Sequence, residues 1–141
     1  MRCPKCMGPL QERWDRRGLL RVKCCADCRC VWFDGKELEA VLRDAFRKLK
    51  VPAGAQPLTL KCPRDRKSLL YSFHFPGTTI RVAMCENCGG LWLETGEFRE
   101  IEHIRRELGA QGAPGREEPP SLAKEALLHF INTALDALDT P

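Results

Sequence analysis

Hydrophobic residues recur with a helical period in two stretches of the chain. The first stretch carries its apolar residues on one side of a helix, at Leu38, Val41, Leu42, Ala45, Phe46 and Leu49. Asp34 and Glu37 stand before it at the spacing of a capping box, which predicts that this helix begins there. The second stretch begins at Glu94 or Thr95, with apolar positions at Phe98, Ile101, Ile104 and Leu108. The pattern predicts two amphipathic helices.

Two short segments with strand-like composition precede each predicted helix. They are residues 10–14 and 19–23 before the first helix, and residues 69–75 and 78–85 before the second. A turn that contains glycine separates the two members of each pair. Each half of the chain therefore predicts a β-hairpin that is followed by a helix.

A cysteine motif occurs twice along the chain. Two thiols separated by two residues are followed four residues later by a tryptophan, at Trp32 and again at Trp92. Upstream of each copy stands a Cys-Pro turn, which starts at Cys3 and at Cys62. A repeated unit of this size buries too little apolar surface to be stable alone and usually requires a metal or disulfides. The repeat therefore predicts one metal-binding unit present in two copies.

We expect a small metal-stabilised α+β fold built from two tandem zinc-ribbon-like modules. Residues 1–49 and 60–108 are the modules, and residues 50–59 are a linker that contains proline. Residues 109–120 are rich in Gly, Pro and charge and predict a flexible linker. Residues 121–139 predict an amphipathic helix whose apolar stripe is too broad to stay in water alone. We expect this stripe to dock on a protein partner, on a second copy of the chain, or back onto the modules.

The first module offers four cysteines with the spacing of a closed tetrahedral zinc site. Cys3 pairs with Cys6, and Cys25 pairs with Cys28. The chain runs directly into the first turn and contains no apolar run of ~20 residues, so we expect a cytoplasmic protein without a membrane span. In that compartment paired Cys-x-x-Cys motifs favour metal over disulfides. We predict structural zinc, although iron sites share this pattern.

The second module departs from this pattern at one ligand. Cys62, Cys85 and Cys88 repeat three of the cysteines, and Asp65 stands in the place of the fourth. A carboxylate oxygen is an accepted zinc ligand, so we predict a second zinc ion held by three thiolates and Asp65. Two alternatives are that Asp65 only caps its turn, which would leave the site degenerate, or that His74 is the fourth ligand.

Two further cysteines and two tryptophans lie next to these sites. When Trp32 is aligned on Trp92, Cys24 and Cys30 fall on positions that are not cysteine in the second module. We interpret Cys24 as a small buried apolar residue and Cys30 as a surface thiol, with a redox or replacement-ligand role as the alternative. The two tryptophans are expected to pack beside the metal turns, burying ~150–250 Å² each. Base stacking is their alternative role.

The formal net charge of +4 is concentrated in the first part of the chain. Residues 1–50 carry thirteen Lys and Arg against seven Asp and Glu, whereas residues 51–141 carry ten against twelve. Cysteine ligands bind zinc as thiolates, so the zinc-loaded chain has a lower net charge than +4. The case for nucleic-acid binding is therefore local to the first hairpin. The candidate phosphate-contacting residues there are Arg16, Arg17, Arg21 and Lys23.

The order of these motifs resembles the prokaryotic zinc-finger family of TFIIB-type transcription-factor zinc-ribbon domains. Residues 85–98 are the closer copy, with Glu94 in place of the usual Asp, and residues 25–38 depart from it by carrying Cys30 where Gly is common. The Cys-Pro-Arg-Asp sequence that ends at Asp65 is similar to a variant in that family. The resemblance covers both modules but not the tail. It implies zinc binding and a ribbon-like fold, and its link to transcription rests on fold similarity alone.

These observations favour a non-enzymatic adaptor or regulatory protein that binds zinc and a macromolecular partner. A protein partner is the leading prediction. A nucleic-acid-binding, transcription-related zinc ribbon acting through the basic first module is the first alternative. A thiol- or zinc-dependent redox sensor is the second. No catalytic residues are predicted, because no general base or substrate pocket is recognisable beside the metal ligands.

Overall fold

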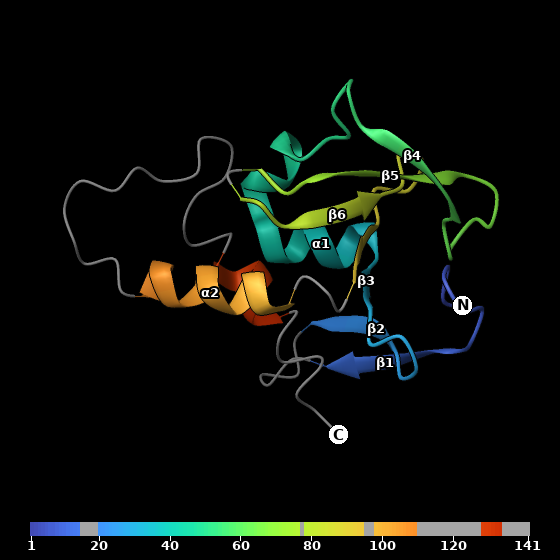
Figure 1. Ribbon diagram of the computed structural model, residues 1–141, viewed down its shortest axis with the longest axis horizontal. Coiled ribbons are helices and arrows are strands. Elements are labelled where there is room, and N and C mark those ends of the chain that lie inside the picture. The colour runs from blue at the N-terminus through green and yellow to red at the C-terminus, as the bar shows by residue number, and fades with distance from the viewer. Residues whose placement is uncertain (15–19, 77, 95–97, 110–127, 134–141) are drawn as a thin grey trace.

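The computed structural model describes residues 1–14, 20–76, 78–94, 98–109 and 128–133 (Figure 1). The elements are β1 (Leu10–Trp14), β2 (Arg21–Cys25), β3 (Val31–Phe33), α1 (Gly35–Leu42), the 3-10 helix η1 (Arg43–Lys48), β4 (Gln56–Lys61), β5 (Leu69–His74), β6 (Arg81–Met84), β7 (Leu91–Leu93) and α2 (Phe98–Gly109). Residues 128–133 are also helical. The chain is thus a small α+β protein, as its sequence predicts.

The strands form one sheet, in which every pair of neighbours is antiparallel, in the order β1-β2-β3-β7-β6-β5-β4. Strands β3 and β7 join the two halves of the sheet, and their register places Trp32 directly opposite Trp92. The flanking pairs are Val31 with Leu93 and Phe33 with Leu91. Equivalent residues of the two motifs therefore oppose one another, so an approximate two-fold axis passes through the tryptophan pair.

Two ion pairs connect the halves with the same approximate symmetry. Lys5 Nζ lies 3.6 Å from Glu94 Oε2, and Arg64 Nη1 lies 3.4 Å from Asp34 Oδ1. The two cations occupy the same position in their Cys-Pro turns, and each acidic residue stands two positions after its tryptophan. Each Cys-Pro turn thus contacts the opposite half of the sheet.

The linker predicted at residues 50–59 is wrong at its C-terminal end, because residues 56–61 form strand β4 beside β5. Leu58 and Leu60 alternate with polar residues and pack, partly buried, against the cluster of cysteines and tryptophans. Pro57 obscured this signal, since proline is rare inside sheets. It is tolerated here because β4 is the end strand of the sheet.

The first predicted helix is shorter than its apolar pattern suggests. Helix α1 ends at Leu42, and Arg43 has a φ of 54° before the chain continues as η1. Asp34 is the N-cap residue, but its side chain does not cap the helix. Its carboxylate accepts hydrogen bonds from Trp32 Nε1 and Lys23 Nζ instead. The capping box is therefore wrong, because the Asp34 carboxylate is occupied by Lys23 and Trp32, and Glu37 Oε2 accepts from the backbone N–H of Arg21 at 3.3 Å.

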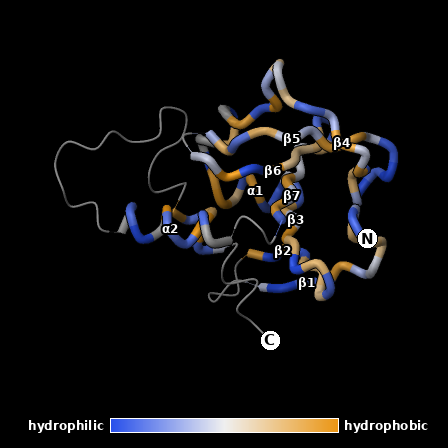
Figure 2. Tube along the Cα trace, in the orientation of Figure 1, coloured by the Kyte–Doolittle hydropathy of each residue, from blue (hydrophilic) through white to orange (hydrophobic). Residues whose placement is uncertain are grey.

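Helices α1 and α2 and residues 128–133 pack onto one hydrophobic core with the sheet. Figure 2 shows hydrophobic segments at α1 and in the middle of the sheet. The ring of Phe130 stacks on Phe75 at 4.6 Å between centroids and lies 5.1 Å from Phe33. Phe130 and Ile131 are fully buried. Of the tail helix expected at residues 121–139, the described part thus docks on its own chain, and the remainder lies outside the described residues.

Candidate metal centres

Four short turns with the same backbone geometry carry the candidate ligands. In each turn the residue after the second ligand position has a positive φ, and its N–H donates to the carbonyl oxygen of the first ligand residue. The bonds are Met7 to Cys3 at 2.9 Å, Arg29 to Cys25 at 2.7 Å, Arg66 to Cys62 at 2.9 Å and Gly89 to Cys85 at 2.9 Å. The turn that contains Asp65 keeps this geometry although it lacks the second cysteine.

The first cluster brings together the four cysteines that the spacing predicts. The Sγ atoms of Cys3, Cys6, Cys25 and Cys28 all lie within 4.8 Å of one another. Zinc bound tetrahedrally by sulfur at ~2.3 Å sets neighbouring sulfurs ~3.8 Å apart. The Cys6 to Cys25 separation is 3.5 Å, close to that value. This donor set fits a closed structural zinc site.

The second cluster brings together three cysteines. Cys62, Cys85 and Cys88 lie with their sulfur atoms within 4.8 Å of one another, and Cys62 Sγ is 3.6 Å from Cys88 Sγ. The backbone N–H of Arg64 donates to Cys62 Sγ at 3.4 Å, which stabilises a thiolate there. The set of three sulfurs fits a zinc ion that takes its fourth ligand from elsewhere.

Asp65 lies beside the second cluster but outside the group of three. Its Oδ2 is 3.9 Å from Cys85 Sγ, and accepts hydrogen bonds from Ser68 Oγ at 2.6 Å and Asn87 Nδ2 at 3.1 Å. Its Oδ1 accepts from the backbone N–H groups of Lys67 and Ser68. These bonds, the Ser68 hydroxyl above all, lower the pKa of Asp65. Asp65 thus caps its turn as a carboxylate, and no motif predicts Ser68 and Asn87 as its partners.

His74, the alternative fourth ligand, is an exposed residue at the end of β5. It pairs across the sheet with Arg81. Among the described residues, the metal-binding groups do not include it.

The thiols of Cys62 and Cys88 in the second cluster form a hydrogen bond. The hydrogen bond between Cys62 and Cys88 raises the pKa of Cys62 and lowers the pKa of Cys88. A metal ion that binds three thiolates displaces these protons, so metal affinity falls as the pH is lowered.

Cys24 and Cys30 lie outside both groups. Cys24 belongs to the hydrophobic core, as predicted, and its burial raises its pKa to about 11. The prediction of a surface position for Cys30 is wrong, because its side chain is buried beside Trp92 and its Sγ is 3.7 Å from Cys3 Sγ. Burial raises the pKa of Cys30 to about 12, although an N–H of Trp92 directed at it acts in the opposite sense. Buried protonated thiols are poor nucleophiles.

The two tryptophans are fully buried with the cysteines in one cluster, which agrees with a packing role. Trp32 Nε1 donates to Asp34 Oδ1 at 2.8 Å. Trp92 Nε1 is buried and has no oxygen or nitrogen acceptor among the described residues, and Glu94 instead pairs with Lys5. Neither ring presents a face to solvent, so neither offers a stacking surface for a base.

Two of the four predicted phosphate-contacting residues can be placed. Lys23 is engaged in its ion pair with Asp34, and its side chain is only 13% exposed. Arg21 lies 3.4 Å from Glu12 and 6.0 Å above the ring of Trp14. Arg16 and Arg17 lie outside the described residues. The hairpin therefore does not present Lys23 to a phosphate.

Comparison with known proteins gives one result. Residues 61–103 match the model of the TFIIB-type zinc-ribbon family, which is described as "Transcription factor zinc-finger". No curated protein and no solved structure matches the chain. The matched region contains the second cluster and Trp92, and the first cluster precedes it. Within the part of the chain that the structure describes, no helix is long and apolar enough to cross a membrane.

Proposed function

We propose that this chain is a tandem pair of zinc ribbons that holds two structural zinc ions and serves as a non-enzymatic binding module for another protein. The tandem arrangement is supported by the four equivalent turns, by the Trp32 and Trp92 register and by the two ion pairs between the halves. The family match supports zinc binding for the second ribbon directly.

The positions of the ligands at the ends of strands support a structural role for zinc. Cys25 is the last residue of β2, Cys62 directly follows β4, and Cys85 directly follows β6. Each metal ion would therefore connect a Cys-Pro turn to the end of a strand in the same half of the protein. Such ions contribute directly to folding stability, because the unfolded chain has no preformed site.

Asp65 is our proposed fourth ligand in the second site. Zinc at ~2.3 Å from sulfur and ~2.1 Å from oxygen sets the two atoms ~3.6 Å apart. The observed 3.9 Å between Asp65 Oδ2 and Cys85 Sγ is close to this value. A small shift of Oδ2 brings it to the metal, while Oδ1 keeps its two backbone N–H donors.

A protein partner is favoured over a nucleic acid because the basic hairpin is engaged in internal contacts at Lys23 and Arg21. The apolar side of residues 128–133 is buried in the core of its own chain at Phe130. A partner would therefore bind a different surface. The nucleic-acid alternative is favoured by the description of the matched family, and it predicts binding that weakens steeply with salt.

The proposal is tested by removing the metal and by searching for the partner. A chelator should strip both ions and abolish the near-ultraviolet circular dichroism of the buried tryptophans, and added zinc should restore it. A chain that keeps this signal without metal contradicts the structural role. Proximity labelling in cells should enrich one protein with the wild-type chain but not with Cys25→Ser/Cys85→Ser, and purified components should reproduce that complex. Retention of an oligonucleotide that decreases between ~50 and ~200 mM salt favours the alternative instead.

A further inference from the structure

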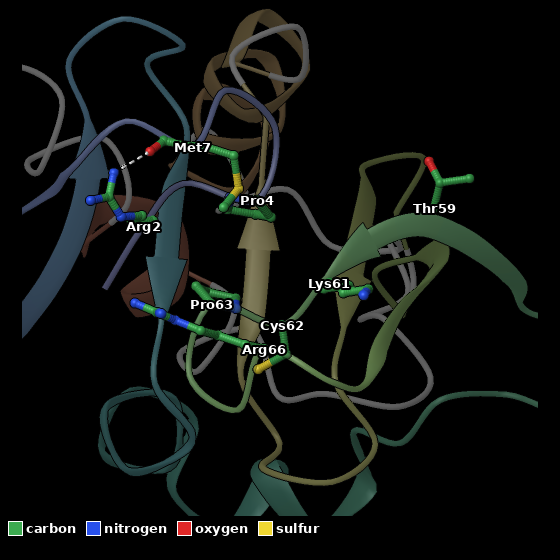
Figure 3. A pocket seen from close by; sticks show the side chains of 8 residues that line it. All are labelled: Arg2, Pro4, Met7, Thr59, Lys61, Cys62, Pro63 and Arg66. Atoms are coloured by element: carbon green, nitrogen blue, oxygen red, sulfur yellow. Dashed lines mark hydrogen bonds between the residues drawn. The ribbon is translucent and has the colours of Figure 1, made fainter.

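A groove with a volume of about 240 Å³ lies between the two Cys-Pro turns (Figure 3). In that view Arg2 and Pro4 of the first turn lie above Pro63 and Arg66 of the second. The described residues that line it are Arg2, Pro4, Met7, Thr59, Lys61, Cys62, Pro63 and Arg66. The groove is therefore formed jointly by both halves of the protein.

The lining repeats the symmetry of the two turns. Counted from the first cysteine of each turn, Arg2 is equivalent to Lys61 and Pro4 to Pro63. Met7 is equivalent to Arg66, and these two residues share the left-handed backbone conformation, with φ values of 63° and 61°. The groove thus lies where equivalent faces of the two turns meet.

The groove is cationic, and none of the described residues that line it is acidic. Arg2, Lys61 and Arg66 are all exposed. Among the described residues, no carboxylate forms an ion pair with any of these three cations, whereas the neighbouring Lys5 and Arg64 are paired across the halves. Three like charges around one concave surface attract an anion more strongly than isolated surface charges do.

Between these cations, Pro4, Met7 and Pro63 give the lining an apolar surface, and Thr59 and Cys62 complete the set. Pro4 and Pro63 are at least partly buried, and Met7 is 59% exposed. Exposed methionine adapts its shape to apolar side chains. Sites for single-stranded nucleic acid combine basic residues with aromatic side chains for base stacking, and this lining contains no aromatic residue. An anion with an aliphatic side chain beside it fits the lining better than a nucleotide does.

Strand β4 contributes Thr59 and Lys61 to the lining and is the end strand of the sheet. An end strand can pair with an extended peptide through backbone hydrogen bonds. Guanidinium groups bind carboxylates through paired hydrogen bonds. The groove therefore combines cations, an aliphatic surface and a neighbouring strand edge, which together suit a peptide.

We propose that this groove binds an acidic peptide segment of a partner protein, one that carries aliphatic side chains between its carboxylates. The inference rests on the proposed function and gives the chemistry of the partner.

The test uses the zinc-loaded full chain and fluorescence anisotropy with labelled probes. The peptide probes are a short peptide of alternating glutamate and leucine and the same peptide with glutamine in place of glutamate. The nucleic-acid probes are short single-stranded DNA and RNA homopolymers. The variants are Lys61→Glu/Arg66→Glu and the milder Lys61→Gln/Arg66→Gln. The control, Lys36→Glu/Arg106→Glu, makes the same charge change at exposed positions of α1 and α2.

The glutamate peptide should bind the wild type and the control alike, and the groove reversal should weaken binding about tenfold or more, with the glutamine variant between them. Added salt should weaken binding, and the glutamine peptide should bind at least tenfold less well. Equal weakening by the control variant, no peptide binding, or tighter binding of DNA or RNA overturns the proposal. The zinc content of each sample is measured as well. A wild-type chain with fewer than two zinc ions means that the proposed function is wrong, whereas a chain with two zinc ions that does not bind the peptide contradicts only the groove proposal.

Discussion

Replacing Gly90 by alanine tests the close contact between the two halves. A Cβ at this position would lie 2.1 Å from Trp32 Cζ2 and 2.4 Å from Trp32 Cη2. Carbon atoms pack favourably at ~3.5–4.0 Å, so the ring would have to move by about 1.4 Å. Trp32 is fully buried, and its Nε1 is hydrogen-bonded to Asp34, so the ring cannot move without breaking that bond.

The expected loss of stability follows from these two effects. Overpacking of a filled core costs about 1–3 kcal/mol. Loss of a hydrogen bond to a charged group adds about 1.5 kcal/mol. The sum, about 3 kcal/mol, is a large part of the ~5–15 kcal/mol that stabilises a domain. For a chain of this length it corresponds to a fall of about 9 °C in the melting temperature.

The assay is thermal unfolding followed by circular dichroism at a fixed excess of zinc, because bound metal shifts the apparent stability. Gly54→Ala is the matched control, since a Cβ there meets nothing within 4 Å. The control should melt at the wild-type temperature or slightly above it. If Gly90→Ala melts within about 2 °C of Gly54→Ala, the packing of Trp32 against Gly90 is refuted.

Three other substitutions probe the charge network and the metal site. Asp34→Asn should cost about 1.5–3 kcal/mol of unfolding free energy in urea titrations, because it weakens the bonds from Lys23 and Trp32. Although burial opposes it, the Lys23 hydrogen bond lowers the pKa of Asp34 in the folded state, so this stabilisation is complete above the unfolded pKa of ~3.9 and is lost only below it. The cost should therefore be equal at about pH 6 and about pH 8, and a cost that halves at the lower pH contradicts the assignment. Cys30→Ala should leave the zinc content unchanged, whereas Cys25→Ala should remove one zinc ion; loss of zinc from the Cys30 variant identifies Cys30 as a ligand.

The local elements could be predicted because their signals lie within short stretches of sequence. The predicted strand at residues 10–14 coincides with β1, and the one at residues 69–75 differs from β5 by a single residue. The four cysteines of the first cluster meet as their spacing predicts. Turn geometry and hydrophobic alternation are local properties, so one sequence is enough to reveal them.

The contacts between the halves could not be predicted in this way. Strands β3 and β7 are three residues long each and carry no alternation that a window could detect. Their pairing depends on the approximate two-fold axis, which is a property of the whole fold. Asp34 was assigned to a helix cap because Lys23 and Arg64, its charged partners, are distant in sequence. The burial of Cys30 is equally invisible in the sequence, since Trp92 from the other half covers it.

Native mass spectrometry counts the zinc ions that the folded chain holds. The wild-type chain should carry the mass of two zinc ions. Cys25→Ser/Cys28→Ser should carry one, and Asp65→Ala should lose its second ion at limiting zinc while keeping the first. A wild-type chain that binds a single zinc ion, or that binds iron in place of zinc, contradicts the account.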